Sequence, residues 1–286
     1  MIRGVRLAFA KWQALGNDYL IVERDALPFP LTAARVRRLC DPHFGPGADG
    51  VLELSPAAEP GFVADLRIFN PDGSEAELSG NGAREAILYL RRAGWTERDT
   101  FSIRTAAGEI RPTITGPSTC RVAMGRASLA SRDFPGGPHD GRGELTAGGR
   151  TWPFQHVSIG NPQCAIEVED PDAIDLAAVG PVIERAAIFP NRTNVSFWRT
   201  LAPGAIRARI FERGVGETLA SGTGACGAAV AHVLRGGTSP VTVRLDGGEL
   251  EVAVGDALDV ELTGWAEPVY EARLSEEATA ALAALR

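Results

Sequence analysis

Two short stretches of this 286-residue chain share a pattern that could hold an anion. Each has a serine, two glycines around one polar residue, and then an apolar helix-like segment, at residues 79–82 (SGNG) and 221–224 (SGTG). A glycine-rich turn that begins a helix leaves several backbone N–H groups unpaired, with the positive end of the helix dipole behind them. Taken alone, such a turn is more often a plain helix cap than a carboxylate or phosphate site.

The two stretches are related by one constant offset of 142 residues, the separation of Phe69 and Phe211. If the halves are related by a pseudo-twofold axis, both helix N-termini can point at one ligand. Two matched side chains on either side of one carbon could then remove a proton from one face and return one to the other. The identical pairs at this offset include Phe69 and Phe211, Glu75 and Glu217, Ser79 and Ser221, Gly80 and Gly222, Gly82 and Gly224, Ala83 and Ala225, and Ala86 and Ala228.

The bulk composition favours a small-molecule partner. The net charge is -7, the isoelectric point is near 5.3, and Lys and Arg form no run, which argues against nucleic acid or an anionic membrane surface. With 44% hydrophobic residues, the chain can build a core in each of two domains. The start, MIRGVRLAFAKW, lacks the hydrophobic region of a signal peptide, and no window reaches transmembrane length, so we expect a cytoplasmic protein.

No metal site is expected from the cysteines and histidines. The cysteines are dispersed and form no CxxC pair, which indicates reduced, structural thiols rather than a disulfide framework or a zinc site. The histidines show no metal-ligand spacing either. These residues are Cys40, Cys120, Cys164 and Cys226, and His43, His139, His156 and His232.

The elements that must position the two turns follow the same order twice. Strands are expected on both sides of the turn at Gly16 and Asn17, and then in GADGVLEL, DLRIFN and FSIRTAAGEIRPTIT, with a helix from Leu31 to Asp41. The second round begins at FQHVSIGNPQCAIEVED and includes an acidic helix from about Ile174 to Ala187. Between the rounds, the segment from Ser128 to Arg150 is rich in Gly, Pro and Asp, as in a surface hairpin or a domain joint.

Several motifs together resemble the diaminopimelate epimerase family, a cofactor-independent racemase group within a wider fold that includes proline racemase and phenazine-type isomerases. They cover nearly the whole chain: LGNDY, GADG, FNPDGSE, SGNGAR, GNPQC, FPNRTNV and ERGVGETLASGTGA. The resemblance implies an α+β fold of two pseudo-symmetric domains, each a curved, mostly antiparallel sheet around a central helix, with a ligand cleft between them. The expected domains are 1–120 with 268–286, and 121–267; a homodimer is compatible with the sequence.

The resemblance also implies a reaction and a site. The reaction is the interconversion of LL- and meso-diaminopimelate, an amino diacid of lysine and cell-wall biosynthesis, without a cofactor. The catalytic positions are Ser79 and Ser221, with Glu212 orienting the second and Gln163 assisting the first. The substrate would be bound by the side chains of Asn17, Asn70, Asn161, Asn194 and Arg213, and its carboxylate by the backbone amides of Gly80, Asn81, Gly222 and Thr223.

The departures from the family pattern concern proton transfer. In typical members the positions of Ser79 and Ser221 are cysteines, and the position of Gln163 is a histidine. A thiol has an unperturbed pKa of about 8.5, whereas a serine hydroxyl lies several units higher and needs a partner that takes its proton. Gln163 can hydrogen-bond Ser79 but cannot accept its proton. Ser79 therefore has no evident base, while Ser221 can still use Glu212.

These departures leave several interpretations open. A designed inactivation would explain both serines, but it does not need Gln163, so we favour natural divergence. The diverged protein could be an epimerase with weaker bases, an isomerase acting on a more activated acid, or a binding protein without turnover. A domain-pairing protein without a ligand is the structural alternative, and it predicts no response to any amino acid.

Overall fold

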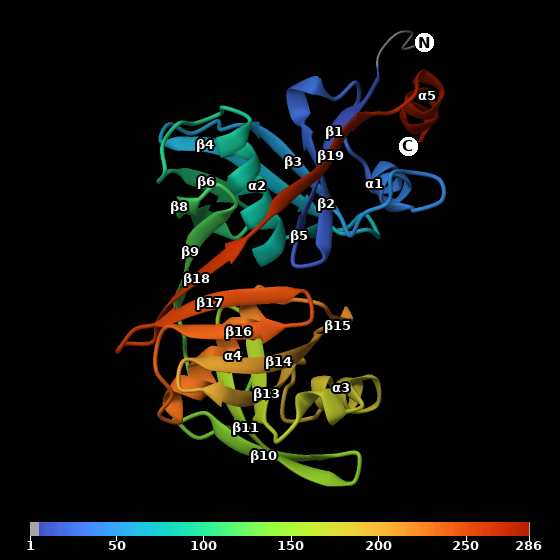
Figure 1. Cartoon of the computed structure of the whole chain (residues 1–286). Helices are drawn as coiled ribbons and strands as arrows, with labels where there is room; N and C mark the ends of the chain where they lie inside the picture. Colours follow the sequence, from blue (N-terminus) through green and yellow to red (C-terminus); the bar gives the residue numbers. More distant parts are fainter. Residues whose placement is uncertain (1–5, 286) are drawn as a thin grey trace. The chain divides into compact units, whose positions relative to one another are not determined.

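The computed structural model describes residues 6–285 and divides into two compact units, Met1–Val122 with Trp265–Arg286, and Ala123–Gly264 (Figure 1). No helix in the described part of the chain is long and apolar enough to cross a membrane. The domain ranges predicted from the sequence, 1–120 with 268–286 and 121–267, stay a prediction.

The first unit contains a sheet of order β19-β1-β2-β3-β4-β6-β7, with β5 paired to β4. Helix α2 packs against β1, β2, β3 and β19, and most of its residues are buried. The elements are β1 (Ala8–Ala14), β2 (Asn17–Glu23), a 3-10 turn η1 (Arg24–Ala26), α1 (Ala33–Cys40), β3 (Val51–Pro56), β4 (Phe62–Phe69), β5 (Glu75–Ala76), α2 (Gly80–Arg92), β6 (Ser102–Thr105), β7 (Gly108–Ile110), β8 (Pro112–Gly116), β19 (Glu267–Arg273) and α5 (Glu276–Ala284).

The second unit is built on the same plan. Its sheet has the order β10-β11-β12-β13-β14-β16-β17-β18-β9, with β8 paired to β9 and β15 to β14, and α4 packs against β11 to β14, β16 and β17. The elements are β9 (Thr119–Arg126), β10 (Arg142–Ala147), β11 (Arg150–Ser158), β12 (Pro162–Glu167), η2 (Pro171–Ala173), α3 (Leu176–Glu184), β13 (Asn194–Ala202), β14 (Ala205–Glu212), β15 (Gly216–Thr218), α4 (Gly222–Leu234), β16 (Val241–Leu245), β17 (Gly248–Val254) and β18 (Asp259–Trp265).

The internal duplication is visible in the topology as well as in the sequence. The strand order β1-β2-β3-β4-β6-β7 matches β11-β12-β13-β14-β16-β17, and α2 and α4 start and end at positions 142 residues apart. The parallel pairs also correspond, since β2 with β3 matches β12 with β13, and β4 with β6 matches β14 with β16. The other described pairs are antiparallel, as predicted.

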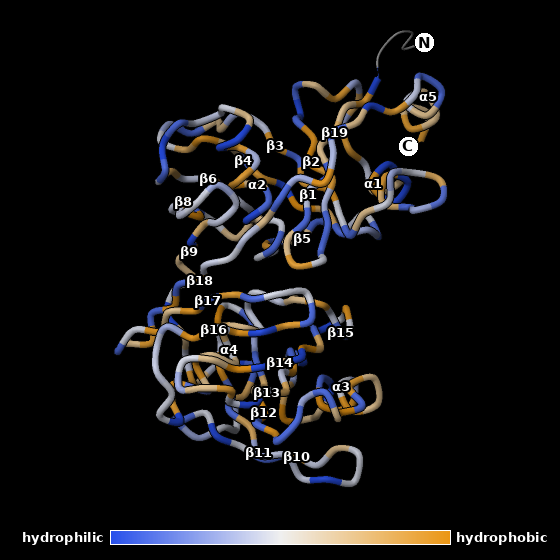
Figure 2. Tube along the Cα trace, viewed as in Figure 1, coloured by the Kyte–Doolittle hydropathy of each residue, from blue (hydrophilic) through white to orange (hydrophobic). Residues whose placement is uncertain are grey.

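The central helices are shaped by close packing inside their sheets. Helix α4 has the sequence GTGACGAAVAHVL and is buried nearly all round, as expected of a helix enclosed by a sheet. Figure 2 shows hydrophobic residues alternating with hydrophilic ones along β16 and β17, two strands of the sheet that α4 contacts. A Cβ on Gly224 would lie 2.7 Å from Ile210 Cδ1, and one on Gly227 would lie 2.7 Å from Gln163 Cβ. Glycine at these positions lets the helix approach the sheet.

The predicted elements are largely present, with one difference of extent. The acidic helix is shorter than the predicted range Ile174 to Ala187 and spans only Leu176–Glu184, because Ile174 closes the 3-10 turn η2 and Asp175 is the N-cap of α3. The segment from Ser128 to Arg150 is a loop followed by strand β10, which forms an antiparallel hairpin with β11. The helices begin at Gly80 and Gly222, as predicted.

Candidate active site in two half-sites

The two serines cap the two central helices. Ser79 Oγ accepts a hydrogen bond from the backbone N–H of Gly82 at 3.1 Å, and Ser221 Oγ accepts one from Gly224 at 3.2 Å. Both serines have extended backbone angles, which is the usual geometry of an N-cap. A helix N-terminus also stabilises negative charge on the capping atom or on a bound anion, so a capping serine is compatible with a chemical role.

An asparagine beside each helix start makes the same kind of contact in both units. In the first unit, Asn81 Nδ2 donates to Asn17 Oδ1 at 3.2 Å, and Asn17 in turn donates to Asp49. In the second unit, Asn161 Nδ2 donates to Thr223 Oγ1 at 3.2 Å. Within each unit, the structure therefore brings the Asn of the Gly-Asn turn to the second residue of the central helix.

Gln163 supports its own half-site. Its side chain is fully buried, and its Nε2 donates to Asn161 Oδ1 at 2.7 Å. Its Oε1 is buried without a hydrogen-bond partner among residues 6–285. A side-chain amide is neither an acid nor a base near neutral pH, so what Gln163 offers in this structure is its hydrogen bond to Asn161.

Glu212 and Ser221 are hydrogen-bonded neighbours in the second unit. Burial raises the pKa of Glu212, while hydrogen bonds from Thr218 and Ser221 act in the opposite direction and lower it. The Thr218 hydroxyl donates to Glu212 Oε1 at 3.0 Å. Ser221 therefore donates a hydrogen bond to this carboxylate and accepts one from the backbone N–H of Gly224, an arrangement in which a carboxylate could take the hydroxyl proton.

The first unit has no carboxylate at the corresponding position. Asn70 aligns with Glu212 at the offset of 142, and its Nδ2 donates to Ser74 Oγ at 3.0 Å, within the turn between β4 and β5. In the second unit, Asn194 Oδ1 accepts from the backbone N–H of Arg213 at 2.7 Å. The guanidinium of Arg213 donates to the Asn191 carbonyl at 3.0 Å, and Arg213 is exposed.

The structure adds one residue to the first half-site that the motifs did not single out. The hydroxyl of Tyr19 donates to Ser79 Oγ at 3.2 Å, and Tyr19 is only 6% exposed. A signal for it exists in the sequence, because aligning the turn GNDY with GNPQ pairs Tyr19 with Gln163. The offset there is 144 rather than 142, so the register of the helices does not reveal the pair.

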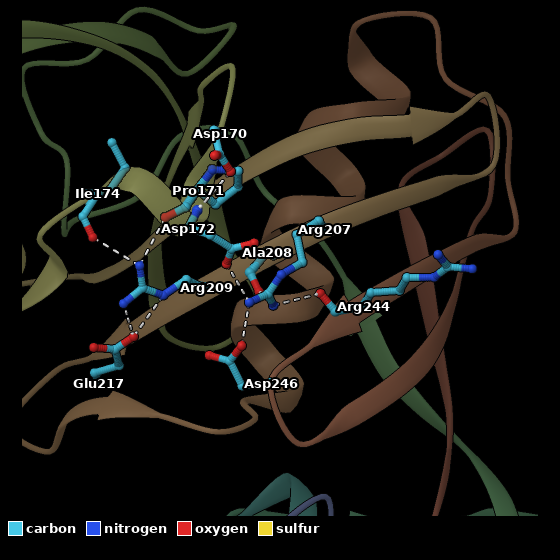
Figure 3. Close-up of polar contacts among 10 residues, drawn as sticks. All are labelled: Asp170, Pro171, Asp172, Ile174, Arg207, Ala208, Arg209, Glu217, Arg244 and Asp246. Carbon is cyan, nitrogen blue, oxygen red and sulfur yellow. Dashed lines mark hydrogen bonds and ion pairs between the residues drawn. The ribbon is translucent and has the colours of Figure 1, made fainter.

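Two matching ion pairs fix the short strands that precede the serines. Arg209 on β14 donates to Glu217 Oε1 on β15 from Nε at 2.9 Å and from Nη2 at 2.6 Å. Figure 3 shows Arg209 also reaching the carbonyls of Pro171 and Ile174. In the first unit, Arg67 donates to the two oxygens of Glu75 at 2.9 and 2.7 Å. Sequence reasoning aligned the two glutamates but missed both arginines.

Comparison with known protein sequences shows the family of this chain. The sequence profile described as diaminopimelate epimerase matches residues 9–130 and 155–267. A diaminopimelate epimerase from Synechococcus sp. (strain JA-3-3Ab) is 41% identical over 95% of this chain and 99% of its own length. The chain belongs to the diaminopimelate epimerase family. A second diaminopimelate epimerase, from Desulforudis audaxviator (strain MP104C), is 43% identical over 93% of this chain and 99% of its own.

The fold is shared more widely than the family. A probable proline racemase from Agrobacterium radiobacter K84 superimposes with a TM-score of 0.69 over 96% of this chain and 95% of its own, at 16% identity. The predicted α+β fold of two similar sheet-and-helix units is confirmed, and so is the family resemblance read from the motifs.

Proposed function

We propose that the protein is a cofactor-independent isomerase that interconverts LL- and meso-diaminopimelate at an α-carbon. The observation that carries the proposal is the pair of serine-capped helix N-termini, each with its own polar partners, in a chain of this family. A diacid with an amino group at each end also suits a site that combines helix amides with asparagines and one arginine.

The binding groups are proposed from each half-site. The capping hydroxyls accept from the N–H groups of Gly82 and Gly224, and the first turn of a helix is where backbone N–H groups can bind a carboxylate. We assign that carboxylate to the backbone amides of Gly80, Asn81, Gly222 and Thr223. The remaining substrate contacts are assigned to the side chains of Asn17, Asn70, Asn161, Asn194 and Arg213.

The proton-transfer groups are proposed to differ between the half-sites. Ser221 takes the α-proton while its own hydroxyl proton passes to Glu212, the only change that this oxygen needs to act as a base. Ser79 acts in the other half-site as the group that returns a proton to the opposite face. Gln163 keeps Asn161 oriented toward Thr223 and takes no part in the transfer.

Two measurements on the unmodified protein test this function. Calorimetric titration with LL- and meso-diaminopimelate tests binding, and proton NMR in heavy water tests deuterium incorporation at the α-carbon. We expect binding of both isomers and slow exchange, because serine is a poorer acid and base than cysteine. Binding without exchange would support a non-catalytic binding protein, and the absence of both would count against the substrate.

Two further sequence predictions stay proposals. A homodimer is supported by β19, which lies at the edge of the first sheet and exposes Val269 and Tyr270 by 52% and 41%. Edge strands with exposed apolar residues pair readily with a second chain. Sedimentation velocity of the purified protein tests the homodimer. The cytoplasmic location stays a prediction.

A further inference from the structure

We infer that Tyr19 is the residue that supplies and recovers the proton of Ser79, in place of the histidine that the family resemblance implies at position 163. The inference rests on the proposed function and adds a named proton partner to it. Tyr19 acts through Ser79 and is therefore a positioning residue rather than a catalytic one. Three features of the first unit carry this assignment: the contact between the two hydroxyls, the fixed place of the ring, and the bonding state of Ser79.

The Tyr19 ring has a fixed place. Tyr19 lies on β2, is nearly fully buried, and donates from Oη to Ser79 Oγ at 3.2 Å. The ring lies directly against the backbone of Gly50, where an added Cβ would be 2.4 Å from Tyr19 Cε1. No side chain larger than a hydrogen fits there without displacing the ring. Gly50 therefore leaves the space that lets the hydroxyl reach the helix cap.

The bonding state of Ser79 is that of a proton donor. A serine hydroxyl has two acceptor lone pairs and one proton. The N–H of Gly82 occupies one lone pair and the hydroxyl of Tyr19 the other. The Ser79 proton is then left for a ligand. Ser221 is in the opposite state, because it accepts from Gly224 and donates to Glu212.

The asymmetry of the duplicated units explains why a tyrosine takes this place. The position equivalent to Glu212 is Asn70, which cannot accept a proton and is bound to Ser74. The position equivalent to Tyr19 in the second unit is Gln163, which serves Asn161. Each serine therefore has one proton-exchanging neighbour in its own unit, a carboxylate for Ser221 and a phenol for Ser79.

The step balances in both directions. When Ser79 gives its proton to the substrate carbanion, a C–H bond forms and the Ser79 O–H bond breaks. The Tyr19 proton then moves to Ser79 Oγ, which leaves a phenolate at Tyr19. In reverse, the phenolate takes the Ser79 proton while Ser79 Oγ takes the α-proton. A phenol is intrinsically a stronger acid than a serine hydroxyl, so of the two oxygens that of Tyr19 is the better place for the negative charge.

The test compares Tyr19→Phe with Tyr89→Phe in the full-length protein. Both changes keep the ring and remove one partly buried, hydrogen-bonded hydroxyl from the first unit, since Tyr89 donates to Glu23 Oε1 at 2.7 Å. Deuterium incorporation at the α-carbon of diaminopimelate and calorimetric binding are measured for each. We expect exchange to fall about 100-fold in Tyr19→Phe, the size of a lost acid–base partner. Binding should change less than about twofold, and Tyr89→Phe should leave both values near those of the parent.

The same substitution in a Ser79→Cys background separates a proton role from a packing role. A thiol with an unperturbed pKa of about 8.5 exchanges its own proton near neutral pH. If the role of Tyr19 is to supply a proton, Tyr19→Phe should therefore lower the exchange rate by less than about threefold in the Ser79→Cys background. An equal loss in both backgrounds overturns the inference, and so does full exchange in Tyr19→Phe, or a parent that binds diaminopimelate without exchanging its proton. Absence of binding by the parent overturns the proposed function and the inference together.

Discussion

Replacing Glu212 with Gln should separate the chemistry of the second half-site from its structure. The amide keeps an oxygen that can accept from Thr218, whose hydroxyl now lies 3.0 Å from Glu212 Oε1. It cannot take the Ser221 proton. Loss of a positioned general base lowers rates by about 10² to 10⁴, which is roughly 3 to 5 kcal/mol of transition-state stabilisation. The affinity for diaminopimelate should change little, because Glu212 makes no proposed contact with the ligand.

The pH dependence of stability and of exchange in Glu212→Gln provides a second, independent test. Burial raises the pKa of Glu212 above its ordinary 4.5, so the folded protein holds this proton at pH values where the unfolded chain has lost it. Its contribution to stability is therefore fully present below about pH 4.5 and is lost as the pH rises through the folded pKa. In Glu212→Gln, the free energy of unfolding should no longer decline as the pH rises through this range. The fall in the α-proton exchange rate at acidic pH, which follows protonation of Glu212 in the parent, should disappear as well.

Deuterium exchange followed by NMR from pH 5 to 9, with urea unfolding at the same pH values, provides the assay. Glu249→Gln is the matched control, because Glu249 is an exposed glutamate of the same unit paired with Arg244 at 2.8 Å. It should change neither the exchange rate nor its pH profile. An exchange rate in Glu212→Gln within a few-fold of the parent, with the acidic limb intact, would refute the assignment of Glu212 as the base for Ser221.

Three further changes test other parts of the molecule. Arg213→Ala should weaken diaminopimelate binding by on the order of 2 to 4 kcal/mol in calorimetry, the cost of losing one partner of a ligand charge pair, whereas Arg199→Ala, an exposed arginine of the same unit, should not. Arg209→Lys should lower the free energy of unfolding in urea by about 1 to 3 kcal/mol, because the Pro171 and Ile174 carbonyls and Glu217 lose their shared donor; Arg67→Lys, whose arginine makes no such carbonyl contacts among the described residues, should cost less. Glu85→Gln should remove a pH dependence, because burial raises the pKa of Glu85 well above its ordinary value and destabilises the parent as the pH rises, by up to about 1.4 kcal/mol per unit; unfolding of both proteins at pH 5 and pH 9 measures it, and a parallel fall in both would contradict this account.

The sequence predicted the central helices well because their determinants are local. Ser79 and Ser221 are N-cap residues, and the glycines after them permit close packing, so both helices start where the motif indicates. The alternation of apolar residues located most of the strands for the same reason. The acidic helix was predicted too long at both ends, since Ile174 closes the preceding 3-10 turn η2, Asp175 caps α3 at its N-terminus and Arg185 ends it. The 3-10 turn is held by Arg209, which lies on β14 and donates to the Pro171 carbonyl, so its place depends on a contact between residues far apart in the sequence.

The side chains that complete each half-site were harder to predict because they depend on register between strands. Glu75 and Glu217 were recognised as an aligned pair, but their partners Arg67 and Arg209 follow only from the antiparallel pairing of β4 with β5 and of β14 with β15. Tyr19 was read as part of a turn motif. Its contact with Ser79 requires the parallel neighbour β3 to begin after Gly50, a position where the chain leaves space for the ring.

The duplicated fold gives two identical serines different hydrogen-bonding neighbours. Their helix caps are the same, with an N–H bond of 3.1 Å at Ser79 and 3.2 Å at Ser221, so the helix dipole cannot distinguish them. The difference comes from the neighbouring strands, which place a hydroxyl that donates beside Ser79 and a carboxylate that accepts beside Ser221. An isomerase that removes a proton from one face and adds one to the other needs such a difference in each direction of the reaction. A thiol can ionise near neutral pH by itself, whereas a serine hydroxyl cannot. In a pair of serines, the neighbouring groups must therefore supply the difference between donor and acceptor.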